Sequence, residues 1–246
     1  MKILKTAVIT FVLVLSGTVN AALVSATYST DNIIYTYLAP GAVDTYGLGI
    51  YDFNFNSSVS VSFTYDNDFT NATSVYSNPP AENYRFQSPA YNASLTIDGV
   101  NVHNSNSSAI TVMDNLTQAP GSGVPQYWID AGFPSELPGP ADALWMGGYS
   151  DDFTYSPAWD GLIFSVDFLD LGGNWLTSSE AIPTSAPDLT AIDFAVLTIS
   201  QYKNNVLQFE AAGIVVNNIS AVPVPAAVWL FGSGLLGLIA FFKRRV

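Results

Sequence analysis

Short runs in which apolar and polar residues alternate fill the middle of the chain. In residues 59–65, Val, Phe and Tyr occupy every second position and Ser or Thr the positions between, a period typical of a strand with one buried face. Residues 95–97 and 100–102 continue this alternation around Asp98-Gly99, a pair that predicts a hairpin with a primed turn. The runs at 162–168 and 192–199 also alternate, and the apolar runs at 206–209 and 214–216 predict the last strands.

These runs predict one all-β domain over residues 22–221. The run at 192–199 is apolar on both faces, so we expect that strand to be buried on both sides. Packing two sheets together buries one face of each, which predicts a single antiparallel, jelly-roll-like β-sandwich. Clusters of Gly, Pro, Asn, Asp and Ser separate the runs, and residues 77–89 and 119–156 are expected to be loops.

The first 21 residues depart from the strand pattern. Lys2 and Lys5 precede an uncharged, largely apolar run over residues 6–15, which is too short to span a bilayer. Val19 and Ala21 place small residues at the cleavage positions. These features predict a secretory signal peptide over residues 1–21, cut by signal peptidase, and the alternative is a buried core helix.

The last 25 residues form a tail with three parts, over residues 222–246. Pro223 and Pro225 come first, and an uncharged run over residues 226–242 follows. At about 1.5 Å per residue this run spans roughly 25 Å as a helix, the short end of the transmembrane range. The basic residues that end it should stay on the cytoplasmic side; they are Lys243, Arg244 and Arg245.

This tail resembles the PEP-CTERM sorting signal that exosortase reads in Gram-negative bacteria. The parent motif is Pro-Glu-Pro, and this chain is closer to the Val-Pro-Leu-Pro-Ala variant, with Val222, Pro223, Val224, Pro225 and Ala226. The resemblance implies a membrane cysteine transpeptidase of the exosortase type as partner, and cleavage near the motif. The uncharged run and its basic end predict a pause in the inner membrane, and the implied cleavage would then release the body to the cell surface or the extracellular space. The alternative is a plain single-pass anchor.

The composition excludes several classes of protein. Apolar residues make up 49% of the chain and aromatic residues 13%, enough to support a core and to argue against disorder throughout. The absence of Cys excludes disulfides and thiolate metal sites. The formal net charge is −13, and all acidic residues lie between Asp31 and Glu210. Such an acidic body would repel nucleic-acid phosphates and attract cations.

One stretch combines aromatic and acidic residues in a way that suits sugars. Aromatic faces stack on the apolar faces of sugar rings, and carboxylates accept hydrogen bonds from hydroxyl groups. The alternative is that these aromatic residues cap the core. The candidate sugar-binding residues are Trp145, Tyr149, Tyr155, Trp159 and Asp160.

Two groups of oxygen-bearing side chains are candidate Ca²⁺ ligands, because hard cations prefer oxygen donors. Neither group matches the EF-hand loop, and ordinary Asx-turn chemistry is the alternative. Otherwise we expect no cofactor. The candidate ligands are Asp66, Asp68 and Asn71 in the first group, and Asp151 and Asp152 in the second.

A search for catalytic groups gives mostly negative results. His103 is the only His, it lies in a polar stretch that predicts an exposed turn, and the chain has no Gly-x-Ser-x-Gly elbow. The sequence therefore predicts a non-enzymatic cell-surface or extracellular-matrix protein. The tail resemblance implies a structural or adhesive role beside exopolysaccharide, as in a biofilm matrix. A carbohydrate-binding module is the second hypothesis, and a secreted hydrolase that uses Asp pairs is the third.

Overall fold

The fold of the central domain comes from a computed structural model of the chain. The signal peptide predicted over residues 1–21 and the tail predicted over residues 222–246 lie outside the described residues. Within the part of the chain that is described, no helix is long and apolar enough to cross a membrane. The described residues are 23–66, 82–86, 92–105, 107–116, 129, 132–135, 139–150, 153, 159–176, 185–215 and 217–221.

Twelve strands make up the regular structure of the described residues. They are β1 (Leu23–Thr30), β2 (Asn32–Leu38), β3 (Val59–Asp66), β4 (Glu82–Phe86), β5 (Asn92–Ile97), β6 (Val100–Ser105), β7 (Ser107–Leu116), β8 (Ala141–Tyr149), β9 (Gly161–Asp170), β10 (Phe194–Lys203), β11 (Val206–Ile214) and β12 (Asn217–Ala221).

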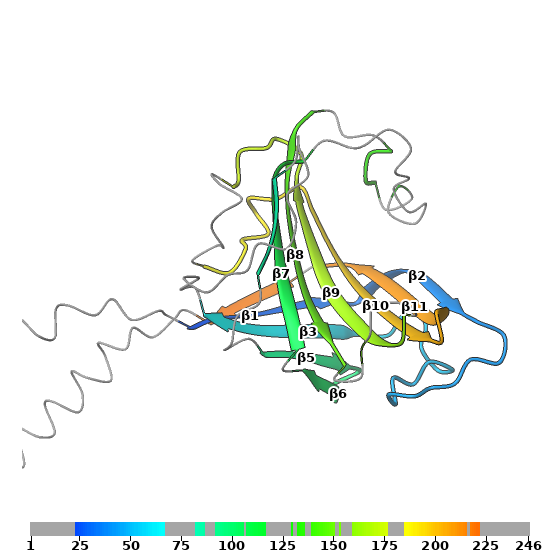
Figure 1. Cartoon of the computed structure of the whole chain (residues 1–246). Helices are drawn as coiled ribbons and strands as arrows, with labels where there is room; N and C mark the ends of the chain where they lie inside the picture. Colours follow the sequence, from blue (N-terminus) through cyan, green and yellow to red (C-terminus); the bar gives the residue numbers. More distant parts are fainter. Residues whose placement is uncertain are drawn as a thin grey trace, which may run out of the picture. The chain divides into compact units, whose positions relative to one another are not determined.

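The strands form two antiparallel sheets packed as a sandwich (Figure 1), which confirms the predicted all-β class. The five-stranded sheet has the order β12-β1-β3-β5-β6, and the seven-stranded sheet has the order β2-β11-β10-β9-β8-β7-β4. Strands β7 to β11 follow one another within one sheet as an up-and-down meander. A jelly roll is built instead from two Greek keys, so the strand order differs from the jelly-roll-like connectivity expected from the sequence.

The main core lies between the two sheets, because each sheet turns its apolar alternation inward. From the five-stranded sheet, Tyr28, Phe63 and Leu95 are almost completely buried. From the seven-stranded sheet, Phe164 and Phe168 meet them; the rings of Tyr28 and Phe168 pack edge to face at 4.8 Å between centroids. Such edge-to-face pairs add to the stabilisation that burial alone gives.

Strand β10 is buried on both faces along its first half, as the run at 192–199 predicts. Ala195, Leu197 and Ile199 point into the main core. On the opposite face Val196 is 1% exposed. A second, smaller core that includes Phe133, Ala143 and Leu169 covers the outer face of the seven-stranded sheet at this end.

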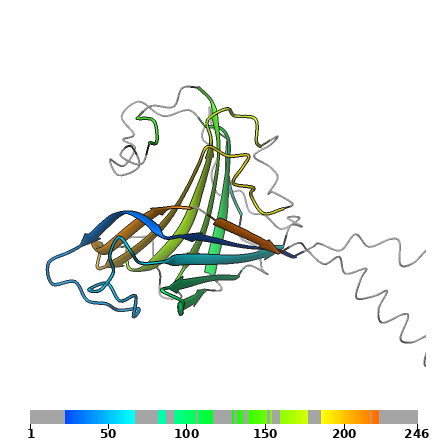
Figure 2. The same cartoon turned by 180° about the vertical axis from the view of Figure 1, so that it is seen from behind.

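The strands of the two sheets cross steeply, and one end of β7 to β10 extends past β1 and β3 (Figures 1 and 2). The loop after β9 covers the inner face of that end: Trp175 packs on Phe168, with 6.4 Å between ring centroids. The buried Asp142 carboxylate accepts a 2.7 Å hydrogen bond from the Leu176 amide and so fixes the loop. The extended end thus keeps an apolar inner face covered without the second sheet.

The predicted hairpin between β5 and β6 is confirmed, and so is its primed turn. Asp98 and Gly99 have φ of 49° and 79°, the left-handed values that a type I′ turn requires at both central positions. Strand β6 runs on to Ser105 and lies at the edge of its sheet. At the other edge β12 pairs with β1, and Ser25 stands opposite Ala221. The first and last strands of the domain are therefore neighbours.

Two segments predicted to be loops contain strands. Strand β4 lies within residues 77–89 and β8 lies within residues 119–156. The second case matters more, because β8 is central in the seven-stranded sheet, between β7 and β9. Its sequence carries Gly147 and Gly148, which lower strand propensity when read locally. The folded sheet needs both glycines, because a Cβ atom at Gly147 would lie 2.2 Å from the Trp145 ring and one at Gly148 would lie 2.5 Å from the Phe164 ring.

Candidate functional site

Strand β8 sends its side chains alternately to the two faces of the seven-stranded sheet. Leu144 and Met146 belong to the main core. Because the period of a strand is two residues, Trp145, Gly147 and Tyr149 point to the outer face. Two of the candidate sugar-binding residues therefore lie on the face that is turned away from the second sheet.

Five aromatic side chains form a continuous row on this outer face. Successive ring centroids are 5.8 Å apart from Trp145 to Tyr149, 4.8 Å from Tyr149 to Phe153, 6.2 Å from Phe153 to Trp159, and 5.2 Å from Trp159 to Tyr202. These spacings fall within the range of favourable aromatic pairs. Below, the aromatic row means Trp145, Tyr149, Phe153, Trp159 and Tyr202.

Two glycines make room for the row. A Cβ atom at Gly147 would lie 2.2 Å from the Trp145 ring, so the indole lies flat across β8 only because this position has no side chain. Gly161 has φ of 111°, and a Cβ atom there would lie 2.8 Å from the Phe153 backbone. The loop that carries Phe153 can therefore approach β9 closely, which brings its ring onto Tyr149.

The turn between β10 and β11 holds Trp159 in place. The Asn205 amide donates a 2.7 Å hydrogen bond to the Trp159 carbonyl oxygen. The Asn205 side-chain oxygen accepts a 3.3 Å bond from the Trp159 amide in return. Asn205 has φ of 64°, a left-handed value that Asn tolerates better than most residues. The backbone of Trp159 is thus fixed from both sides while its ring faces outward.

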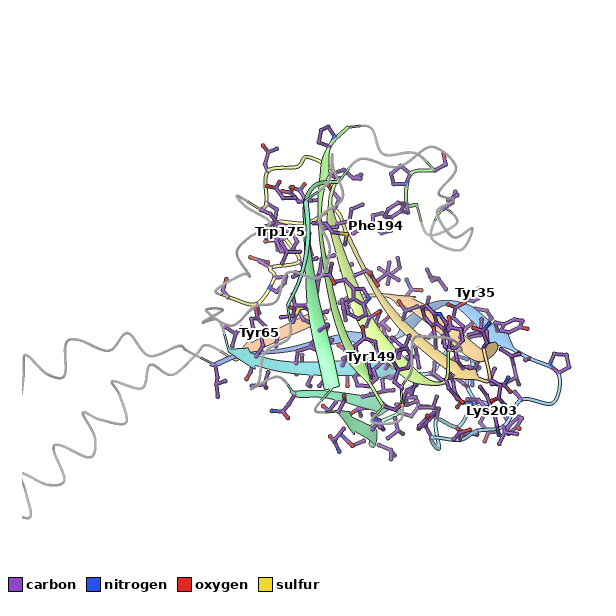
Figure 3. The ribbon with its side chains drawn as sticks, viewed as in Figure 1. Tyr35, Tyr65, Tyr149, Trp175, Phe194 and Lys203 are labelled. Carbon is purple, nitrogen blue, oxygen red and sulfur yellow. The ribbon has the colours of Figure 1, made fainter. Side chains whose placement is uncertain are left out.

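The members of the row differ in exposure. Trp159 is 37% exposed and Tyr149 only 3%. The other three rings are half-buried. Tyr149, labelled in Figure 3, therefore forms the floor of the row, and the more exposed rings present the surface that a ligand would meet.

Polar groups continue the outer face beyond the row, on β10, β11 and β2. The Ser200 hydroxyl lies 3.4 Å from a Glu210 carboxylate oxygen. Burial raises the pKa of Glu210, and the Ser200 hydroxyl partly offsets that rise. Burial and the nearby Glu210 charge both raise the pKa of Tyr202 and of Tyr35, so both phenols stay protonated at neutral pH. Hydroxyl and carboxylate groups thus lie beside aromatic rings.

Asp167 lies on the same outer face, directly across from Trp145 in the strand register. The residue keeps partial solvent exposure, yet its carboxyl group is closely surrounded, and burial raises its pKa to about 7. The Ser165 and Thr198 hydroxyls lie 3.4 and 3.5 Å from the carboxylate and lower the pKa only in part. Long contacts of this kind are weak hydrogen bonds.

The structure brings together three of the five candidate sugar-binding residues: Trp145, Tyr149 and Trp159. Asp160 is half-buried next to Trp159 in the chain, and Tyr155 lies outside the described residues. Sequence reasoning missed Phe153 and Tyr202. Tyr202 comes from β10, far along the chain, and only the strand pairing places it here. Phe153 stood inside the same aromatic stretch and could have been included.

The candidate Ca²⁺ ligands are mostly outside the described residues: Asp68, Asn71, Asp151 and Asp152 lie there, and Asp66 ends β3. Among the residues that the structure describes, no group of three or more His, Asp or Glu side chains is placed to hold a metal ion.

His103 differs from the exposed turn that its polar neighbours predicted. It belongs to β6 and is half-buried. Its ring packs edge-on between Tyr46 and Phe164, with centroid distances of 6.1 and 6.0 Å. The alternation of β6 turns this side chain inward at the rim of the core, although its sequence neighbours are polar.

No protein-family model, no curated protein and no solved structure matches the chain.

Proposed function

We propose that this chain is an exported, non-enzymatic protein of the cell surface or extracellular matrix, which adheres to exopolysaccharide through the aromatic row. The observation that carries the proposal is the row itself, with Trp159 37% exposed at its surface. Single exposed apolar side chains are common on soluble domains, whereas aromatic rings in one continuous row offer an extended apolar surface for a ligand. A glycan strand offers the flat apolar faces that such rings contact.

The polar groups beside the row support a sugar ligand rather than a purely apolar one. Glu210 and Ser200 offer acceptors to sugar hydroxyl groups, and Tyr202 offers both a ring face and a hydroxyl. Binding sites commonly combine apolar contact area with a few polar groups that fix orientation. A carbohydrate-binding module that takes one defined glycan is the second candidate, and the same row supports it.

The route to the surface rests on the two ends of the chain. In this proposal signal peptidase removes residues 1–21, and the helix over residues 226–242 pauses in the inner membrane. An exosortase-type transpeptidase then cuts near the motif at residues 222–226 and releases the domain outside. The apolar runs and the basic residues at their ends support export, and the resemblance of the motif supports cleavage.

The test compares variants of the full chain for retention on polysaccharide from the producing cells and on a glycan array. Trp159→Ala should weaken retention about fivefold or more, the size expected for a Trp that anchors a contact. Phe55→Ala is the matched control, because Phe55 is a 59% exposed aromatic residue outside the row. Equal retention by the two variants would refute the glycan site. Binding across many glycans favours the matrix role, and binding to one favours the module.

A further inference from the structure

A cavity of about 120 Å³ lies beside Asp167 on the outer face of the seven-stranded sheet. It occupies the end of the sheet that extends past the other sheet, where Phe194 is labelled in Figure 3. Phe133 covers it and packs edge to face on Phe194, with ring centroids 5.5 Å apart. Phe133 is only 6% exposed, and it forms a second small core with Ala143 and Leu169. This is the cover that buries Val196.

The walls of the cavity are apolar except at Asp167. On β8, β9 and β10, none of the residues that flank Asp167 on this face has a side chain that titrates. They are Ala143, Trp145 and Gly147 on β8, Ser165 and Leu169 on β9, and Phe194, Val196 and Thr198 on β10. Lys203 is the only Lys or Arg whose side chain the structure describes. It lies five positions beyond Thr198 on the same strand, about 16 Å away at ~3.3 Å per residue.

Arg85, on β4, shares a register row with Asp167 through Thr111 and Trp145, but it lies three strands away, about 14 Å at ~4.8 Å per strand. The carboxylate thus has only two weak hydroxyl contacts, and no cation whose side chain the structure describes stands near enough to pair with it. Removing an ionised carboxylate from water without a partner is unfavourable. A cationic group from outside would relieve that cost. A ligand that brought such a group on a small hydrocarbon body would also fill the apolar part of the cavity and remove its methylene groups from water.

We propose that this cavity is a binding site for a small aliphatic amine, with the ammonium group on the Asp167 carboxylate and the hydrocarbon body between Phe133, Ala143 and Phe194. The volume sets the size class. A cavity of about 150 Å³ accommodates benzene, so 120 Å³ suits an amine of about four to six carbons. Trp145 of the aromatic row stands across from Asp167, so the two sites are neighbours, but this proposal does not depend on glycan binding.

The pairing makes binding depend on pH in a defined direction. The ammonium group of an alkylamine stays charged between pH 5.5 and 8, whereas the pKa of Asp167 is raised to about 7. The carboxylate is therefore almost fully ionised at pH 8 and almost fully protonated at pH 5.5. Affinity for the amine should fall roughly thirty-fold from pH 8 to pH 5.5, in proportion to the ionised fraction.

The experiment is isothermal titration of the full chain with three four-carbon probes: n-butylamine, n-butanol and butyrate. At pH 8 we expect n-butylamine to bind at least tenfold more tightly than n-butanol, and butyrate not to bind. Asp167→Asn should abolish the preference for the amine and leave n-butanol binding in place. Asp52→Asn is the matched control, since it removes an exposed carboxylate from the loop after β2. Ala143→Leu fills the cavity and should abolish binding of both the amine and the alcohol.

Each other result decides against the proposal. Equal affinity for n-butylamine and n-butanol, or no binding of either, would show that Asp167 recruits no amine. Amine binding that survives Asp167→Asn, or that Asp52→Asn removes equally, would mean non-specific attraction to the acidic body. Amine binding that survives Ala143→Leu would place the ligand outside the cavity. Circular dichroism of each variant checks that the fold is intact, and n-butanol binding that persists in Asp167→Asn while the preference for the amine is lost separates this variant from a misfolded one.

Discussion

Replacing Asp167 by Asn should make the domain more stable at alkaline pH and change little at acidic pH. The native carboxyl has its pKa raised from 3.8 to about 7, so it holds a proton that the unfolded chain has already lost. Between about pH 4 and pH 7 the native state therefore binds more protons than the unfolded state, and stability falls as pH rises through this window. Asn has nearly the same shape as Asp and never ionises, so the variant lacks this fall of stability with pH.

The size of this loss of stability follows from the pKa shift of Asp167 and from its solvent exposure. Each pH unit within the window costs about 1.4 kcal/mol and the loss levels off at the native pKa, so the full shift gives about 2.6 kcal/mol between pH 5 and pH 8. Asp167 keeps partial solvent exposure, and solvent screening reduces the effect. We expect wild type to lose about 1–2 kcal/mol over this interval relative to Asp167→Asn.

The assay is urea denaturation of the full chain at pH 5 and pH 8, followed by tryptophan fluorescence. With a slope of about 2 kcal/mol per M, the expected difference moves the midpoint of wild type relative to the variant by about 0.5–1 M between the two pH values. The comparison between the two proteins cancels the titration of Glu210, Asp170 and Asp188, which both share. Parallel pH dependences in wild type and Asp167→Asn would refute the reasoning, because the carboxyl would then titrate as a solvated group.

Two further predictions concern the row and the tail. Gly147→Ala should lower the free energy of unfolding by about 1–3 kcal/mol and weaken polysaccharide retention, because the new Cβ atom would lie 2.2 Å from the Trp145 ring. Gly139→Ala is the control, since a Cβ atom there meets nothing within 4 Å. Equal denaturation midpoints for the two variants would contradict the prediction. Intact-mass measurement of the surface protein should find a species that begins near Ala22 and lacks residues 227–246, whereas a species that still ends at Val246 would indicate a plain membrane anchor.

The alternation of the sequence was enough to predict the class of fold and several strands. Residues 59–65 alternate cleanly because β3 buries one face, and Asp98-Gly99 specifies its turn by local conformational preference alone. β8 was not predicted because residues 119–156, which contain it, hold five prolines and were expected to be a loop, and two glycines also interrupt the strand itself. Both glycines are required by the packing of aromatic rings against β8. Trp145 lies over Gly147, and a Cβ atom at Gly148 would lie 2.5 Å from the Phe164 ring. Such demands come from packing, which no local pattern records.

Part of the candidate site was also predictable from the sequence. Trp145, Tyr149 and Trp159 share one stretch of sequence, so their composition pointed to them together. The contribution of Tyr202 depends on the pairing of β9 with β10. Asp167 stands between the inward residues Val166 and Phe168, and alternation alone would place it in solvent. Its apolar surroundings arise because Phe133, from a segment expected to be a loop, folds over that end of the sheet.

The pairing of β1 with β12 has a consequence for how the domain acquires its structure. The two strands are separated by nearly the whole domain, so contacts such as Thr27 with Ile219 form only after a very large loop has closed. A chain that emerges from its N-terminus must hold β1 with one edge unpaired until the last strand arrives. Open strand edges recruit other chains. The slowest and most aggregation-prone moment of folding should therefore be the interval before residues 217–221 are available, and a truncation just before β12 should expose that edge permanently.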